Sequence, residues 1–155
     1  MKVAYPGTFN PWHNGHQYVY ERLCSMFGRD DVYVTPAINP TKQLSMAQKT
    51  VIPAMINAAI DNKTNIVMTT DTIVTTCKTL GIGCIARGIR SGQDATNEFT
   101  MADWNLDRGL NTVFIYCGAE LRKLSSSALR ELHSFGEDIS KYMPAGAHDV
   151  WLNGN

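Results

Sequence analysis

The first sixteen residues constrain the fold more strongly than any other part of this chain. Val3-Ala4-Tyr5 is a short apolar run typical of a buried β-strand, and Pro6-Gly7 ends it. From Gln17 to Met26 the apolar residues recur at helical spacing. The segment therefore predicts a strand, a glycine-containing loop and a helix in succession. In such a unit the backbone N–H groups and the positive end of the helix face one point, which favours the binding of a phosphate.

Two histidines stand at this predicted phosphate site. His13 and His16 lie on either side of Gly15, and histidine can donate a hydrogen bond to a phosphate oxygen as a cation or as a neutral ring. A single histidine at the start of a helix is more often a cap or a surface residue, so each one alone indicates little. The whole pattern, Gly-Thr-Phe followed by His-x-Gly-His after the first strand, is far more specific.

The rest of the chain continues to alternate between strands and helices. Further strands are predicted at 32–34, 65–68, 82–86 and 112–116, and helices at 46–60, 72–80, 95–108, 128–132 and 147–152. Pro53 falls inside the second predicted helix, so that helix either bends there or begins near Val51. Because helices separate the strands, we expect an α/β fold whose five-stranded parallel sheet has helices on both faces.

Length and charge limit the classes of protein that fit this chain. Its 155 residues suit one domain spanning 1–155. The 14 basic and 14 acidic residues cancel, so the charge indicates neither a nucleic acid nor a membrane as partner. No apolar run is long enough to span a bilayer, and no signal-peptide pattern opens the chain. We expect a cytoplasmic protein with four buried thiols, because no Cys-x-x-Cys spacing joins Cys24, Cys77, Cys84 and Cys117.

Basic and hydroxyl side chains follow the predicted strands at their carboxyl ends, where ligands of open parallel sheets bind. Arg87 and Arg90 flank Gly88-Ile89 after the fourth strand, and guanidinium groups suit phosphates. Lys42 follows the second strand and is either a solvated lysine or an anion ligand. Ser125-Ser126-Ser127 precedes a helix and supplies either a plain N-cap or a group of phosphate donors, with Arg130 within reach. The Gly-rich motifs of dinucleotide-binding and P-loop proteins are absent.

Four motifs together resemble the signature of the phosphopantetheine adenylyltransferases, a family of the nucleotidyltransferase superfamily. The similarity runs from about residue 3 to 150, and the order and spacing of the motifs are specific although each motif alone is weak. Two departures are Asn10, where an acidic residue is common, and His13, where threonine is frequent. The resemblance implies a Rossmann-like sheet and, usually, a homohexamer. The motifs are Tyr5-Pro6-Gly7-Thr8-Phe9, His13-Asn14-Gly15-His16, Arg87-Gly88-Ile89-Arg90 with Glu98 beyond it, and Ser125-Ser126-Ser127.

The resemblance also implies a reaction, in which ATP and 4′-phosphopantetheine give dephospho-coenzyme A and pyrophosphate. Mg²⁺ would be bound through the ATP phosphates, and no side chain is expected to be a metal ligand. The implied catalytic residues are His16, which would stabilise charge on the α-phosphate, with Thr8, Lys42 and Arg90. The implied acceptor-binding residues are Thr8, Lys42, Ile73, Arg87, Met101 and Asn105. The implied ATP-binding residues are Thr8, Phe9, His13, His16, Gly88, Ile89, Arg90, Glu98, Leu121, Arg122, Lys123, Leu124, Ser125, Ser126 and Ser127.

Such a site needs no catalytic pair of carboxylates. The nucleophile is already an anionic phosphate, so no general base is required, and catalysis rests on positioning and on stabilisation of charge. Three alternatives stay open. The acceptor could instead be nicotinamide mononucleotide, glycerol phosphate or a sugar phosphate. A catalytically silent protein that binds a nucleotide or coenzyme A would not need His16 and Lys42, and a purely structural building block would explain none of these residues.

Overall fold

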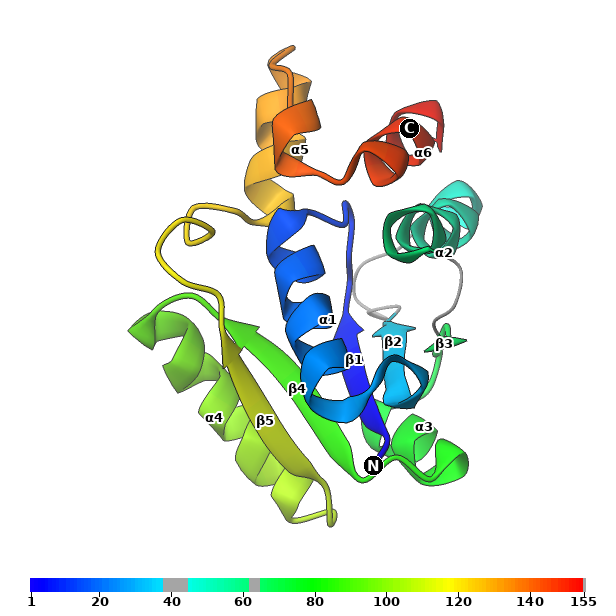
Figure 1. Cartoon of the computed structure of the whole chain (residues 1–155), viewed down its shortest axis with the longest axis vertical. Helices are drawn as coiled ribbons and strands as arrows, with labels where there is room; N and C mark the ends of the chain where they lie inside the picture. Colours follow the sequence, from blue (N-terminus) through cyan, green and yellow to red (C-terminus); the bar gives the residue numbers. More distant parts are fainter. Residues whose placement is uncertain (38–44, 62–64, 155) are drawn as a thin grey trace.

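The structure is a computed structural model that describes residues 1–37, 45–61 and 65–154 (Figure 1). The described strands form one parallel sheet in the order β3-β2-β1-β4-β5, and the α/β fold predicted from the alternation of elements is confirmed. The strands are β1 (Val3–Gly7), β2 (Val32–Pro36), β3 (Asn65–Ile66), β4 (Cys84–Ile89) and β5 (Asn111–Tyr116).

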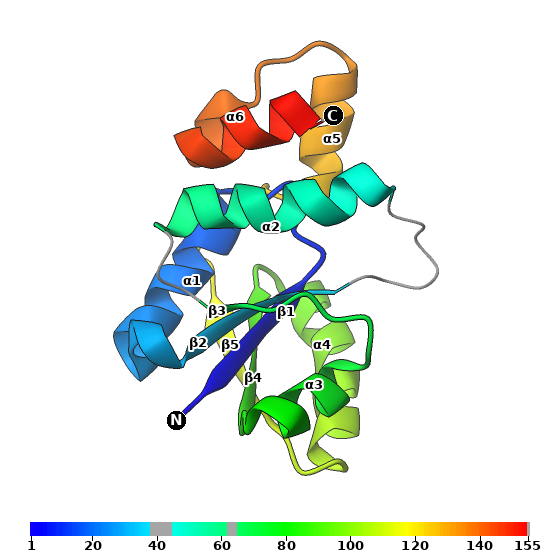
Figure 2. The ribbon, with the colours of Figure 1, turned by 90° about the vertical axis from the view of Figure 1, so that its right-hand side faces the viewer.

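Helices cover both faces of the sheet. Figure 2 shows α1 on one side and α3 with α4 on the other, while α2, α5 and α6 gather beyond the carboxyl ends of the strands. None of the helices in the described ranges is long and apolar enough to cross a bilayer. The helices are α1 (Asn14–Phe27), α2 (Met46–Ile60), α3 (Ile73–Leu80), α4 (Gly92–Leu106), α5 (Ser126–Ser134) and α6 (Ala145–Gly154), with 3₁₀ turns at Arg29–Asp31 and Ser140–Tyr142.

Alternate residues of the central strand enter two separate apolar clusters. Val3 and Tyr5 belong to the larger cluster, which contains buried residues of α1, α2, α5 and α6. Ala4 points to the opposite face and joins a smaller cluster with Ile85 of β4 and Cys77 of α3. The two-residue period of a strand produces this division, and it explains why a parallel strand reads as a continuous apolar run.

Two element boundaries that shape the site differ from the prediction. β4 extends to Ile89, because Arg87, Gly88 and Ile89 pair in register with 114–116 of β5. The first three residues of the Arg-Gly-Ile-Arg motif therefore lie in the strand rather than in a loop after it. α1 begins at Asn14, three residues before the predicted start, because the side chain of His13 caps the helix.

α2 runs through Pro53 without interruption, so of the two predicted alternatives the helix begins at Met46 and not near Val51. Ser45 Oγ accepts a hydrogen bond from the Gln48 N–H at 3.2 Å, and Gln48 Oε1 accepts one from the Ser45 N–H at 2.9 Å. This reciprocal cap satisfies two donors of the helix start and helps the helix tolerate the missing N–H of Pro53. The predicted site residue Lys42 lies just before this helix, outside the described residues.

Candidate active site

A cleft opens at the carboxyl ends of β1 and β4, where the connections leave the sheet in opposite directions. Its volume is about 480 Å³, which lies within the range of roughly 300–1,000 Å³ that holds small ligands. Ligands of open α/β sheets bind at this kind of crevice. The lining combines β1 and its following loop, the start of α1, the end of β4, one face of α4 and the start of α5.

The two histidines of the cleft hold the start of α1 together. His13 Nδ1 accepts hydrogen bonds from the backbone N–H groups of Gly15 at 3.1 Å and His16 at 3.4 Å. His16 Nδ1 accepts one from the His13 N–H at 3.3 Å, and the rings stack with their centroids 3.7 Å apart. Because each Nδ1 is an acceptor, each neutral ring carries its proton on Nε2. The capping role therefore leaves an Nε2–H donor on each ring for a ligand.

Gly15 has a steric reason to be glycine. A Cβ at this position would lie 2.9 Å from His13 Cε1 and 3.0 Å from His13 Nδ1. A larger residue would push the imidazole away from the N–H groups that it caps. The glycine of the His-x-Gly-His pattern therefore allows the first histidine to lie directly over the helix start.

Both histidines are neutral near pH 7. Burial lowers the pKa of His13 to about 4, and the positive charge of Arg90 acts in the same direction. Burial also lowers the pKa of His16 well below its ordinary value, followed by the effects of His13, Arg90 and Arg87. The site therefore offers two fixed neutral donors, which can stabilise a negatively charged oxygen without first taking up a proton.

Glu98 of α4 holds Arg87 in a bidentate ion pair. Arg87 Nε and Nη2 donate to the two carboxylate oxygens at 2.7 Å each, and Nη1 donates to the Pro6 carbonyl oxygen at 2.9 Å. Burial by itself would lower the pKa of Arg87, but the hydrogen bond and charge of Glu98 raise it overall. Glu98 was expected at ATP, yet here both of its oxygens accept hydrogen bonds from the arginine.

Asp94 holds Arg90 in a similar way, one helical turn earlier. The Arg90 backbone N–H and Nε each donate to Asp94 Oδ2 at 3.0 Å, and Nη1 donates to the carbonyl oxygen of Leu124. The hydrogen bond from the Arg90 side chain is the main reason that the pKa of Asp94 is lowered. Both arginines of the motif are thus oriented by acids that lie four residues apart on one face of α4.

The serine run forms both a cap and a link to the loop after β1. Ser125 Oγ accepts a hydrogen bond from the Ala128 N–H at 3.1 Å and caps α5. Ser126 Oγ donates to the Pro11 carbonyl oxygen at 2.9 Å. Since all three serines line the cleft, the N-termini of α1 and α5 both open onto it. Two helix N-termini at one cleft favour the binding of an anion.

Arg130 contributes a further cation at the start of α5. Its Nη1 donates to the Asn10 carbonyl oxygen and its Nη2 to Ser127 Oγ at 3.3 Å. Three arginines and two carboxylates line the described part of the cleft, which leaves one net positive charge when the histidines are neutral. The described cleft is therefore positively charged, and its N–H donors come from backbone, imidazole and guanidinium groups.

Most residues expected at ATP lie together, although five do not line the cleft. Leu121 and Leu124 are partly or fully buried, Arg122 donates to the Tyr116 hydroxyl oxygen at 3.2 Å, and Lys123 Nζ lies 5.5 Å from the centre of the Tyr142 ring. Ile89 ends β4 and is also absent from the lining. The expected residues that do line the cleft are Thr8, Phe9, His13, His16, Gly88, Arg90, Glu98, Ser125, Ser126 and Ser127.

The expected acceptor residues divide into two groups. Thr8 and Arg87 line the cleft, whereas Ile73, Met101 and Asn105 do not. Ile73 packs against the smaller core cluster. α4 begins beside the cleft and ends near the start of β5, so residues near its far end lie away from the cleft. Asn105 is buried near that end, and Met101 is 54% exposed. Lys42 stays a prediction, because it lies outside the described residues.

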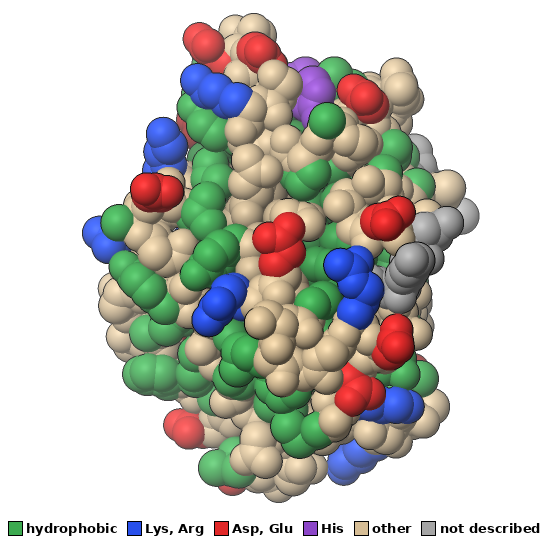
Figure 3. Space-filling view, in the orientation of Figure 1, with side chains coloured by type: hydrophobic (Ala, Val, Ile, Leu, Met, Phe, Trp, Pro, Cys, Tyr) green, Lys and Arg blue, Asp and Glu red, His purple; other side chains and the backbone are tan. Residues whose placement is uncertain are grey.

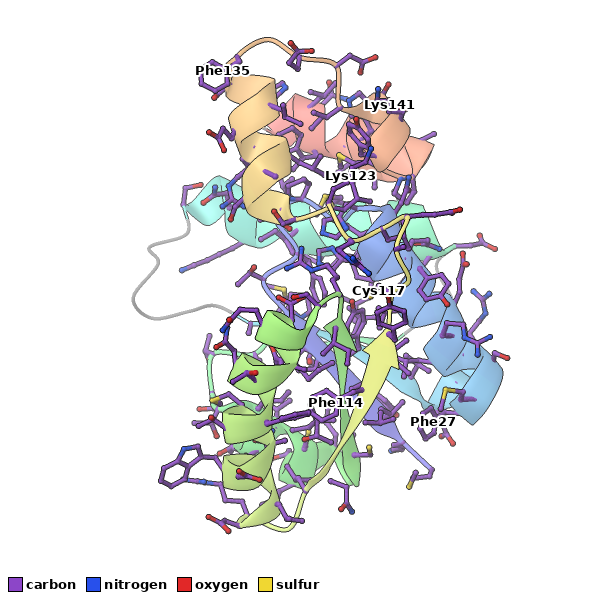
Figure 4. All side chains as sticks on the ribbon, turned by 90° about the vertical axis from the view of Figure 1, so that its left-hand side faces the viewer. Phe27, Phe114, Cys117, Lys123, Phe135 and Lys141 are labelled. Carbon is purple, nitrogen blue, oxygen red and sulfur yellow. The ribbon has the colours of Figure 1, made fainter. Side chains whose placement is uncertain are left out.

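Sequence reasoning missed several cleft residues. Tyr5 was placed in the first strand and in the Tyr-Pro-Gly-Thr-Phe motif but was not predicted to bind a ligand, because a tyrosine there is indistinguishable from a core residue. Asp94 was not among the predicted site residues, although its place four residues before Glu98 and after two arginines was a usable signal. Asn10 and Cys117 also line the cleft. Figure 4 shows Cys117 where β5 ends, below the loop that carries Lys123.

The Rossmann-like sheet and this positively charged cleft with its paired histidines define a nucleotide-binding α/β protein of the nucleotidyltransferase class. The sequence model of the cytidylyltransferase-like family matches residues 4–132. Phosphopantetheine adenylyltransferase of Lactococcus lactis is 31% identical over 150 residues, covering 90% of this chain and 87% of the relative. That of Porphyromonas gingivalis is 33% identical over 146 residues, covering 93% and 94%. The chain therefore belongs to the cytidylyltransferase-like family and, within it, to the phosphopantetheine adenylyltransferase family.

Solved structures share the fold at low sequence identity. Plasmodium falciparum nicotinic acid mononucleotide adenylyltransferase in complex with NaAD has a TM-score of 0.64 at 15% identity, covering 99% of this chain and 96% of its own. A Vibrio parahaemolyticus protein described as a nicotinate-nucleotide adenylyltransferase has a TM-score of 0.65 at 20% identity, covering 99% and 100%. These likenesses agree with the predicted Rossmann-like sheet.

Proposed function

We propose that this protein transfers the adenylyl group of ATP to 4′-phosphopantetheine, giving dephospho-coenzyme A and pyrophosphate. The observation that carries the proposal is the pair of neutral histidines at the cleft, whose Nδ1 atoms cap α1 and whose protons lie on Nε2. A phosphate oxygen of the acceptor attacks the α-phosphorus, and the bond from the α-phosphorus to the oxygen of the leaving pyrophosphate breaks. The nucleophile is already anionic, so no proton has to be removed.

The cleft residues divide between the two substrates in this proposal. His16 Nε2–H donates to an oxygen of the α-phosphate, where negative charge accumulates during attack. Arg90, Arg130 and the N-terminus of α5 face the phosphates of ATP. Arg87 faces the acceptor phosphate, with Thr8 between the two substrates. Lys42 belongs to the acceptor side by family resemblance, and this assignment stays a prediction.

Magnesium would enter this site with ATP. The described residues contain no group of three histidine, cysteine or acidic side chains that could hold a metal ion. Asp94 and Glu98, the carboxylates that line the described cleft, both pair with arginines. In the described part of the cleft the carboxylates are thus engaged by arginines, whereas Mg²⁺ commonly binds substrate phosphates and keeps several of its waters.

A homo-oligomer, a hexamer by family resemblance, is part of the proposal. Several large apolar side chains of α4 and β5 are 53–60% exposed, which is a liability for a monomer unless a partner covers them. Figure 3 shows apolar side chains gathered on the side of the molecule where α4 and β5 lie. Light scattering measures the assembly, and a monomer at micromolar concentration would contradict it. The exposed apolar residues of α4 and β5 are Phe99, Met101, Trp104, Leu106 and Tyr116.

A metabolic enzyme of this kind would act in the cytoplasm.

Pyrophosphate release tests the choice of acceptor. The protein is incubated with ATP and Mg²⁺ and, in parallel, with 4′-phosphopantetheine, nicotinamide mononucleotide or glycerol 3-phosphate. We expect release with 4′-phosphopantetheine only. Release with one of the other compounds would support adenylyl transfer but show that the acceptor is not 4′-phosphopantetheine. Binding of ATP or coenzyme A without any release of pyrophosphate would favour a catalytically silent binding protein.

A further inference from the structure

Tyr5 is a buried residue in the wall of the cleft. Only 4% of it is exposed, yet it is among the residues that line the cleft. Its ring meets Phe9 and Trp12 edge-on, with centroid distances of 5.2 Å and 6.1 Å. Aromatic packing of this kind fixes the ring in place. The position of the phenol oxygen is therefore set by the fold before any ligand binds.

The hydroxyl of Tyr5 lies among cleft residues. Within the described ranges, no hydrogen bond joins Tyr5 Oη to another residue. Burial raises the pKa of the phenol, and the two side chains that also act on it are Cys117 and Arg87. Both of them line the cleft, so the hydroxyl lies at the cleft floor near Arg87. It remains protonated and is a donor.

The side chain of Tyr5 is largely buried, but its hydroxyl is not among the fully buried atoms without a hydrogen-bond partner in the described residues, so it is open to the cleft. Phenylalanine would fill the same aromatic packing but would offer the cleft no donor. A donor held near Arg87 and open to the cleft is suited to a ligand that brings an acceptor atom to this part of the cleft. The positive charge of the cleft and the nearby guanidinium indicate that this acceptor is a phosphate oxygen.

We propose that Tyr5 is a substrate-binding residue whose Oη–H donates a hydrogen bond to a phosphate oxygen of the ligand, on the side of the acceptor beside Arg87. This inference deepens the proposed function and rests on it for the identity of the acceptor. The hydroxyl would orient the attacking phosphate, while Arg87 supplies the positive charge that attracts this phosphate. The bond is made in the bound complex as well as during transfer, so its main effect is on affinity.

The variant Tyr5→Phe removes the hydroxyl and keeps the ring. Calorimetry measures the binding of 4′-phosphopantetheine and of ATP separately, and steady-state kinetics gives KM for each substrate. We expect the Kd and KM for 4′-phosphopantetheine to rise by about tenfold, as for the loss of one hydrogen bond to a charged group. The values for ATP should change less than twofold, and the melting temperature should be nearly unchanged. Tyr18→Phe, at a half-exposed position of α1 away from the cleft, is the matched control.

The two substrates and the wild type separate the possible outcomes. Weaker binding of ATP instead of 4′-phosphopantetheine would support a hydrogen bond from Tyr5 to a phosphate, but would show that this phosphate belongs to ATP. Equal affinities and equal kinetics for both substrates in Tyr5→Phe would overturn the inference. If the wild type forms no dephospho-coenzyme A, the proposed function fails. The affinities of the variant for 4′-phosphopantetheine, ATP and inorganic pyrophosphate then still decide whether Tyr5 contacts a phosphate, because unchanged values for all three would overturn the contact.

Discussion

Glu98 and Arg87 are joined by two parallel hydrogen bonds of 2.7 Å, one to each carboxylate oxygen. A third hydrogen bond of 2.9 Å joins the same guanidinium to the Pro6 carbonyl oxygen of β1. Three contacts from two elements fix the plane of the guanidinium, and some of its N–H groups remain for a ligand. The carboxylate on α4 therefore orients a cation at the end of β4.

The substitution Glu98→Gln should weaken the binding of the acceptor more than the binding of ATP. The amide has one oxygen and no charge, so it cannot accept both guanidinium hydrogen bonds, and Arg87 is no longer held in one orientation. We expect KM for 4′-phosphopantetheine to rise by about five- to tenfold, equivalent to roughly 1–1.4 kcal/mol, with little change in KM for ATP. Glu137→Gln, an exposed position, is the control. A rise confined to the KM for ATP would instead support the expected contact of Glu98 with the nucleotide.

The stability of the protein should fall between pH 7 and pH 5 because of His13. The pKa of His13 is about 4 in the folded protein and near 6.5 when unfolded, so between these values the unfolded chain binds more protons. Stability is therefore complete above about pH 6.5 and is lost as the pH falls toward 4. Between pH 7 and 5 the expected loss is roughly 2 kcal/mol.

Urea unfolding of the wild type and of His13→Asn at both pH values measures this loss. Asparagine is a good N-cap and does not titrate, so the variant keeps a cap acceptor and removes the ionisation. The variant should lose about 2 kcal/mol less than the wild type between pH 7 and pH 5. The same pH dependence in both proteins would show that His13 is not held neutral by the fold.

A buried hydrogen bond connects α6 to the loop after β1, at the edge of the cleft. Trp151 Nε1 of α6 donates to Asn10 Oδ1 at 3.1 Å, and the carbonyl oxygen of Asn10 accepts from Arg130. Trp151→Phe leaves the Asn10 amide oxygen buried without this donor, at a cost of roughly 1–3 kcal/mol in the free energy of unfolding.

Urea unfolding and ATP titration test this connection together. We expect the Kd for ATP to rise several-fold in Trp151→Phe, because Asn10 and hence Arg130 lose a fixed position. Trp104→Phe, a substitution at a site that is 55% exposed on α4, should leave both quantities nearly unchanged. A destabilised variant with unaltered ATP affinity would limit Trp151 to a structural role.

The order of strands and helices could be predicted well from this sequence, and the local reasons are clear. Parallel strands are apolar on both faces, and the segments between them have helical spacing. The helix predicted at 72–80 ends at Leu80, where Gly81 follows in a left-handed conformation. The end of β4 was misplaced because a charged Arg87 does not resemble a strand residue, whereas pairing with β5 decides the structure there.

Many residues that line the cleft were also accessible to sequence reasoning, because they lie in short contiguous motifs. Contacts between distant segments were not. Nothing local to Glu98 shows that it faces an arginine rather than solvent or ATP, since its helical position alone fits all three. The hydrogen bond from Trp151 to Asn10 spans most of the chain, and the position of the Tyr5 hydroxyl at the cleft becomes visible only once the ring and the cleft are placed. Tertiary packing decides each of these cases.

The rate of dephospho-coenzyme A formation by the wild type and His16→Ala is the most direct test of the central claim. His16 offers its Nε2–H to the transferring group, and loss of one such donor costs at least about a hundredfold in turnover. We predict that decrease with ATP affinity nearly intact and with an unchanged circular dichroism spectrum. Equal rates for the two proteins would contradict the account and remove His16 from the chemistry.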